Sequence, residues 1–176
     1  MTATKRGLTV FAVALVGSAL LGAVAGLIWG AVAPRALFQV VTQGEAQLAN
    51  PESNAFILAD VWFCGIAAVG GLITGLAGVR LLVRKDGWPA AAGLVLGAVA
   101  AAFVMMWIGG LIGLSTYNHQ LATAGANVYF NNSLALSAKS VLSFWLLVTA
   151  AIIALTSAGS RAPALQLGEV GPASDG

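Results

Sequence analysis

The chain has 176 residues, of which 59% are hydrophobic and only 8% are charged, and its mean hydropathy is +0.92. About a quarter of the residues in a soluble domain are normally charged, so this composition excludes an ordinary water-soluble fold. The net charge of +2 does not point to nucleic acid, because the basic residues flank apolar stretches, where Lys and Arg set membrane topology.

Four long apolar stretches fill most of the sequence: Leu8–Ala31, Ala55–Val83, Pro89–Leu114 and Ser140–Leu155. Each is long enough, counted with its flanks, for a helix to cross a hydrocarbon core of about 30 Å. We therefore predict an all-α integral membrane protein, with a bundle of four transmembrane helices in residues 1–158. The first stretch is longer than the core of a signal peptide, so it is expected to stay uncleaved. Residues 159–176 are predicted to be a disordered cytoplasmic tail.

The basic residues predict the orientation of the bundle. Six lie at the N-terminus, in the second loop and in the tail, and two lie on the other side of the spans. The six are Lys5, Arg6, Arg80, Arg84, Lys85 and Arg161, and the two are Arg35 and Lys139. Short cytoplasmic loops are enriched in Lys and Arg, so we predict a multi-pass plasma-membrane protein with both termini cytoplasmic. Arg80, Arg84 and Lys85 either bind anionic lipid headgroups of the inner leaflet or only set the topology.

An internal repeat indicates two tandem helical hairpins in the same orientation, as in some transporters. The segment LLGAVA at Leu20–Ala25 is similar to VLGAVA at Val95–Ala100. Asp60 and Lys139 occupy comparable places near the outer starts of the second and fourth spans. A lone charge in hydrocarbon is costly, so we expect these two side chains to form an ion pair or to share a water network. The alternative is that each side chain extends to the headgroups.

Small residues recur at every fourth position of three spans and therefore share one helix face. The glycines of these stripes are Gly22, Gly26, Gly30, Gly71, Gly75, Gly93 and Gly97. A smooth face lets two helix backbones approach closely in lipid. Packing inside the bundle is favoured over homodimerisation, since three spans carry such a stripe and all of them need neighbours.

The two loops predicted to lie outside are longer and more polar. A short surface helix is expected around Arg35–Leu48, where Leu37, Val40, Val41 and Leu48 could form an apolar face. The second outer loop contains His119 and an Asn-rich patch. His119 has no Cys or carboxylate cluster beside it, so we expect a solvated loop residue and predict no metal and no cofactor.

The segment ADVWF at Ala59–Phe63, the glycine-rich run to Gly78 and the basic turn RKDGWP at Arg84–Pro89 resemble small four-span membrane proteins of actinobacteria. That family is known only as a domain of unknown function. The resemblance implies a bacterial plasma-membrane protein and carries over no catalytic residues.

The sequence contains no carboxylate pair within a span and no nucleophile motif, so we do not expect an enzyme. The predicted function is an accessory or interaction protein of the cell envelope, which contacts the lipid bilayer and either a membrane protein partner or a second copy of itself. The alternative is a small transporter or channel component, motivated by the tandem hairpins and Asp60. A polar path between the helices would favour the alternative, and a dry, glycine-packed core would argue against it.

Overall fold

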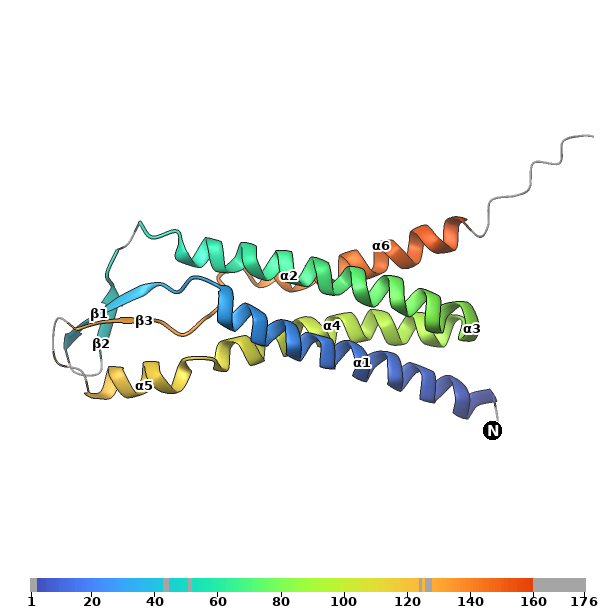
Figure 1. Ribbon diagram of the computed structural model, residues 1–176, viewed down its shortest axis with the longest axis horizontal. Helices are drawn as coiled ribbons and strands as arrows, with labels where there is room; N and C mark the ends of the chain where they lie inside the picture. The colour runs from blue at the N-terminus through green and yellow to red at the C-terminus, as the bar shows by residue number, and fades with distance from the viewer. Residues whose placement is uncertain (1–2, 43–44, 51, 124, 126–127, 160–176) are drawn as a thin grey trace, which may run out of the picture.

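Four long helices lie side by side in the computed structural model, which describes residues 3–42, 45–50, 52–123, 125 and 128–159 (Figure 1). They are α1 (Ala3–Val32), α2 (Ala55–Gly78), α4 (Trp88–Leu111) and α6 (Ser143–Gly159). A π-helical turn, Val79–Val83, extends α2 into the short α3 (Arg84–Asp86), and a 3-10 turn, Lys139–Leu142, precedes α6. All four are long and apolar enough to cross a membrane, which confirms the predicted bundle of four membrane helices.

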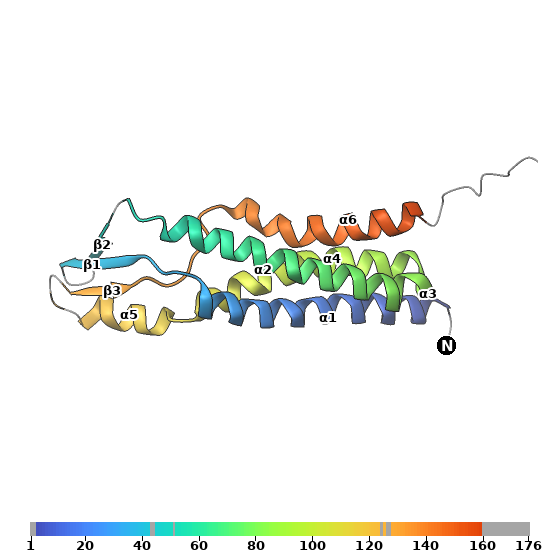
Figure 2. The same cartoon turned by 45° about the horizontal axis from the view of Figure 1, so that its top comes forward.

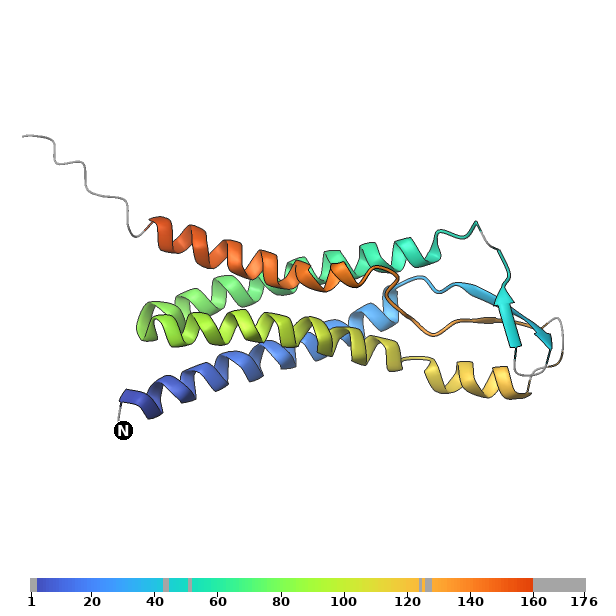
Figure 3. The same ribbon diagram turned by 180° about the vertical axis from the view of Figure 1, so that it is seen from behind.

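The two ends of the bundle differ. The start of α1, the α3 turn and the end of α6 gather at one end, and the other end carries a small folded unit (Figures 1 and 3). We call this unit the head. It consists of β1 (Leu37–Thr42), β2 (Glu45–Leu48), α5 (Leu114–Thr123) and β3 (Tyr129–Asn131). Residues 160–176, with Arg161 and almost all of the predicted tail, lie outside the described part of the chain.

The predicted surface helix at Arg35–Leu48 is wrong, because this segment forms an antiparallel hairpin of β1 and β2. The three strands are ordered β2-β1-β3, and Phe38 faces Leu48 on one side and Phe130 on the other. The most deeply buried residue of β1 is Val40, which is 0% exposed. It lies between the half-buried Gln39 and the exposed Val41. β-branched residues favour strands, and the pairing with β3, which lies far along the chain, decides between strand and helix.

The helices pack most closely in two pairs, α1 with α4 and α2 with α6. The members of each pair run in the same direction, and α1 and α6 lie on opposite sides of a middle layer formed by α2 and α4 (Figure 2). Consecutive helices of a predicted hairpin are therefore neighbours but not the closest partners. The two segments of the sequence repeat, in α1 and α4, belong to one closely packed pair.

The turn between α3 and α4 is formed by a glycine and a proline. Gly87 has a φ angle of 65°, in the left-handed region that favours glycine, and Pro89 lies in the first turn of α4. Gly113, with a φ of 86°, makes a second such break between α4 and α5. This break ends the apolar helix and turns the chain into the head.

Candidate functional site

The glycine stripes lie where α1 and α4 approach each other. A Cβ atom on Gly22 would overlap the backbone of Ala101, and one on Gly26 would lie 2.7 Å from the carbonyl oxygen of Met105. The α4 glycines are equally enclosed: added Cβ atoms at Gly93 and Gly97 would lie 2.8 Å from the Phe11 carbonyl oxygen and 2.8 Å from Ser18 Oγ, respectively. These glycines therefore let two parallel backbones touch inside the bundle.

The pair formed by α2 and α6 also packs closely at glycines, but at fewer positions. A Cβ on Gly71 would lie 2.9 Å from the carbonyl oxygen of Trp145, and one on Gly75 would lie 2.8 Å from Ile152 Cδ1. The Thr149 hydroxyl also donates a 3.3 Å hydrogen bond to the Gly71 carbonyl, across 78 residues of sequence. Gly30, at the end of α1, packs against the side chain of Ile112. All seven glycines of the predicted stripes thus contact a neighbouring segment of the same chain.

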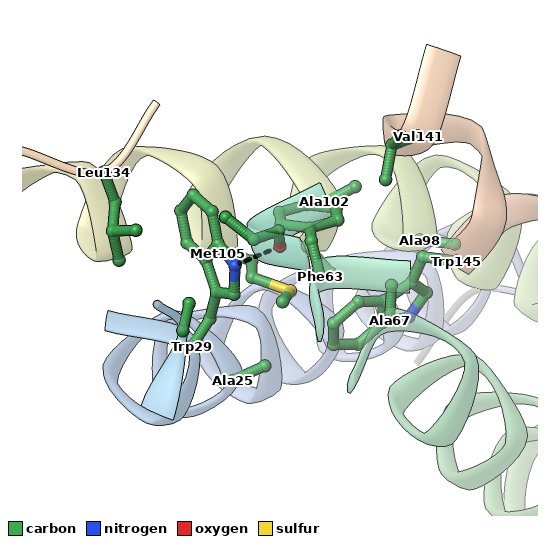
Figure 4. Close-up of a cluster of buried hydrophobic side chains, with 13 residues drawn as sticks. Ala25, Trp29, Phe63, Ala67, Ala98, Ala102, Met105, Leu134, Val141 and Trp145 are labelled. Atoms are coloured by element: carbon green, nitrogen blue, oxygen red, sulfur yellow. Dashed lines mark hydrogen bonds between the residues drawn. The ribbon is translucent and has the colours of Figure 1, made fainter. Parts of the chain in front are cut away.

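The centre of the bundle is filled by large apolar side chains (Figure 4). Trp29, Phe63, Met105 and Trp145 are each 0% exposed. Trp29 packs edge to face on Phe63, with ring centroids 5.3 Å apart, and its indole N–H donates a 2.9 Å bond to the carbonyl of Ala59. The Trp145 indole donates to the Thr74 hydroxyl, 3.2 Å away. The polar atoms of these indoles are therefore satisfied within the protein, as burial requires.

Asp60 joins the start of α2 to the segment that leads into α6. Its two carboxylate oxygens accept hydrogen bonds from the backbone N–H groups of Ser137, at 3.2 Å, and Ala138, at 3.0 Å. These amides precede a helix start and have no partner within the helix, so a carboxylate stabilises them as it would at a helix N-terminus.

The predicted ion pair between Asp60 and Lys139 is not formed. Within the described residues the one ion pair closer than 4.0 Å joins Arg6 Nε to Asp86 Oδ1, at 2.8 Å. Lys139 is the first residue of the 3-10 turn; it is exposed and lines a surface pocket together with Trp107 and Leu111. The carboxylate is bound to backbone N–H groups instead, and the alternative, in which each side chain extends to the headgroups, stays a prediction.

The remaining predicted basic site lies at the end opposite the head. Arg80, Arg84 and Lys85 are all exposed around the π-helical turn and α3. Asp86, next to them, is largely buried with a side-chain exposure of 12%, and it ties this turn to the start of α1 through Arg6. This end is therefore strongly basic on its surface.

A polar pocket of about 330 Å³ lies between α5, β3 and the end of α4. One wall is formed by Thr116 and Gln120, which share a face of α5 because they are four residues apart, and the other by β3 and the residue after it. The full lining is Arg35, Gly113, Thr116, Gln120, Tyr129, Phe130, Asn131 and Asn132. Tyr117 and Phe130, with ring centroids 5.4 Å apart, hold α5 against β3. This pocket is the candidate functional site.

Arg35 forms the base of the pocket, just beyond the end of α1. Its Nη2 donates to the carbonyl of Gly30, at 2.8 Å, and weakly to that of Ile112, at 3.5 Å. The guanidinium therefore binds the last carbonyls of α1 and α4, where helix dipoles favour a cation. Its Nε is the one fully buried side-chain N or O atom in the described part of the chain with no hydrogen-bond partner. An unsatisfied buried donor costs about 1–3 kcal/mol.

The residues that line this pocket can be seen in the sequence, but the sequence does not predict that they lie together. From the sequence alone, Arg35 is one of the two basic residues on the side of the membrane with fewer of them. Asn131 and Asn132 are part of an Asn-rich loop. The β1–β3 pairing, in which Leu37 faces Asn131, brings these segments together. The available signal in the sequence is an arginine that follows Pro34, a few residues after the end of the first span.

The comparisons with known proteins leave the family open, because no family model, no curated protein and no solved structure matches the chain. The resemblance to actinobacterial four-span proteins therefore stays a prediction. The chain is a polytopic protein with four candidate membrane spans.

Proposed function

We propose that this chain is a non-enzymatic protein of the plasma membrane that acts as an accessory subunit or interaction partner through its head. The observation that carries the proposal is the contrast between a filled bundle and a folded head. Trp29 and Trp145 fill the space between the helices, whereas the head presents strands whose outer edges are not covered by another strand of the described chain. Uncovered strand edges offer backbone N–H and C=O groups to a partner.

The exposed side chains of the head support this role. Leu37 and Val41 on β1 are each 45% exposed, and Tyr129 on β3 is 56% exposed. Apolar and aromatic groups on a strand that is open to water are typical of a surface that binds protein. The partner is either another membrane protein or a second copy of this chain.

The alternative is a small transporter or channel component, and it has less support. Asp60, the charge that motivated it, accepts hydrogen bonds from backbone N–H groups near the head end of α2. The centre of the bundle is filled by aromatic and aliphatic side chains, and its buried hydroxyls, those of Ser18, Thr74 and Thr149, form hydrogen bonds within the protein. Coupled transporters usually carry ionisable groups at the depth where the solute crosses.

Photo-crosslinking in the native membrane tests the interaction role. A photoreactive phenylalanine at Tyr129 or Leu37 is expected to give a discrete protein adduct. The same residue at Leu20, which is 65% exposed on α1, serves as the control that faces lipid. No adduct at the head positions, together with recovery of a lone monomer in mild detergent, would contradict the proposal. A solute flux through the protein in liposomes that Asp60→Ala abolishes would favour the transporter over the interaction role.

The proposed orientation, with both termini cytoplasmic, rests on the basic residues at the end opposite the head. Single cysteines can report it in a Cys64→Ser background. We expect Lys85→Cys to react with a membrane-impermeant maleimide only after the cells are permeabilised, and Leu37→Cys to react in intact cells. The reverse pattern would place the head in the cytoplasm.

A further inference from the structure

The pocket beside Arg35 combines a cation with neutral donors and contains no carboxylate. Its eight lining residues include one arginine and no Asp or Glu. Arg35 also has no acidic partner within 4.0 Å, since the ion pair that the described residues form lies at the other end of the bundle. The guanidinium is compensated only by the carbonyls at the ends of α1 and α4, so no carboxylate competes with an anion for it.

The guanidinium is bound on one side only. Both of its hydrogen bonds come from Nη2, and Nε has no acceptor. Arginine binds oxyanions through the N–H groups of its planar guanidinium, and Nη1 of Arg35 forms no hydrogen bond within the described residues. An oxyanion in the pocket would accept from Nη1, whereas the fully buried Nε lies out of its reach.

The other lining side chains suit several oxygens at once. Thr116, Gln120, Asn131 and Asn132 each carry a hydroxyl or amide that can donate a hydrogen bond. They come from α5 on one side and from β3 and its end on the other, so they surround the space above the guanidinium. A tetrahedral group with three or four oxygens uses such a set more fully than a planar carboxylate.

The depth of the pocket indicates where the group comes from. Arg35 lies three residues beyond the end of α1, and Gly113 lies two residues beyond the end of α4. With α1 and α4 spanning the bilayer, both positions fall just past the ends of these apolar helices, which places them at the depth of the headgroups. We propose that this pocket binds a phosphate group, carried by an anionic lipid headgroup or by a free phosphate ester. The proposal goes beyond the interaction role and does not depend on it.

The test uses the full chain in detergent micelles and two probes. Native mass spectrometry measures the binding of phosphatidylglycerol against that of monogalactosyl diacylglycerol, a glycolipid without phosphate. Calorimetry measures the binding of glycerol 1-phosphate, which has no acyl chains. We expect at least one of the two phosphate probes to bind: phosphatidylglycerol alone identifies a lipid headgroup, and glycerol 1-phosphate identifies a free ester.

Variants then locate the binding. Arg35→Lys keeps the charge and loses the planar fork, so we expect the dissociation constant to rise about tenfold, as for a lost hydrogen bond to a charged group. Because Arg35 also binds two helix ends, the double variant Gln120→Ala/Asn131→Ala provides a second probe that leaves these ends intact, and the same rise is expected. Arg80→Gln removes a cation at the opposite end and should change the constant less than twofold.

Two results would overturn the proposal. One is that neither phosphate probe binds, with phosphatidylglycerol retained no better than the glycolipid. The other is that binding falls equally in Arg80→Gln and in the pocket variants, which would mean general attraction to a basic protein. Loss confined to the pocket variants supports the site.

Discussion

The bundle and the head are held together by opposite kinds of contact. In the bundle, the helices approach closely because glycine has no side chain: Gly22 and Gly97 let the backbones of α1 and α4 touch. In the head, the chain is held by backbone pairing of β1 with β2 and β3 and by a few buried side chains such as Val40 and Phe130. Lipid tails compete with apolar side chains for contact, so only tight packing stabilises helices there, whereas a head in water uses hydrogen-bonded strands and burial.

This difference between the bundle and the head predicts where amino-acid substitutions are tolerated. A bundle that depends on close packing is sensitive to added atoms at its contacts and to lost atoms at its centre. Its outer surface, by contrast, touches only lipid and should accept almost any apolar residue. The head should tolerate substitution of its pocket side chains, because backbone pairing holds its strands.

The largest effect is expected at the centre of the bundle. Trp29→Ala removes a side chain that is 0% exposed, together with its bond to the Ala59 carbonyl. We expect a loss of about 3–5 kcal/mol in the free energy of unfolding, as for other large-to-small changes in a core. Unfolding in mixed micelles with increasing sodium dodecyl sulfate measures it. The control is Trp62→Ala, since Trp62 is 48% exposed on α2, and an equal loss in both variants would show that the centre is not specially packed.

The junction between bundle and head should be the next most sensitive place. Asp60→Ala leaves the N–H groups of Ser137 and Ala138 without their acceptor, and hydrogen bonds to charged groups contribute about 1.5–3 kcal/mol. Besides a lower stability, we expect faster hydrogen exchange of these two amides. Glu52→Ala, which removes an exposed carboxylate nearby, is the control. Unchanged exchange at Ser137 and Ala138 would mean that the carboxylate does not hold this segment.

A matched pair of glycines within α1 tests the packing of the bundle directly. A Cβ on Gly22 would overlap the backbone of Ala101, whereas one on Gly17 would meet nothing within 4 Å. Overpacking of this kind costs about 1–3 kcal/mol, so Gly22→Ala should lower the thermal midpoint in detergent. Gly17→Ala should leave it unchanged or raise it, because alanine is the better helix former. Equal midpoints would argue that α1 and α4 are not in contact.

Much of the bundle is predictable from sequence because its signal is local. Apolar length defines each span, and a spacing of four places Gly22 and Gly26 on one face. The spacing does not say which helix lies against that face. The partner of α1 is α4, with α2 and α6 as the other pair, and this choice depends on the fit of whole surfaces.

The head is much less predictable, because its contacts join distant parts of the chain. The apolar residues of Arg35–Leu48 fit a helix face as well as a strand, and the pairing of β1 with β2 and with the distant β3 favours the strand. The error at Lys139 has the same origin. Its helix begins at Lys139 itself, because the preceding residues are extended and are bound to Asp60 in another helix.

The smallest effect is expected at the end opposite the head, where a single ion pair joins α1 to the α3 turn. Arg6 is 66% exposed, so water and salt screen its attraction to Asp86, and Arg6→Gln should cost about 0.2–1 kcal/mol. The loss should shrink when the salt concentration is raised to about 1 M, where screening acts over about 3 Å. Lys5→Gln removes an adjacent charge that forms no ion pair within the described residues and serves as the control. A double-mutant cycle with Asp86→Asn measures the pair itself. A larger, salt-independent loss would mean that this end is also held by a buried polar contact, and the contrast between a close-packed bundle and a hydrogen-bonded head would then be too simple.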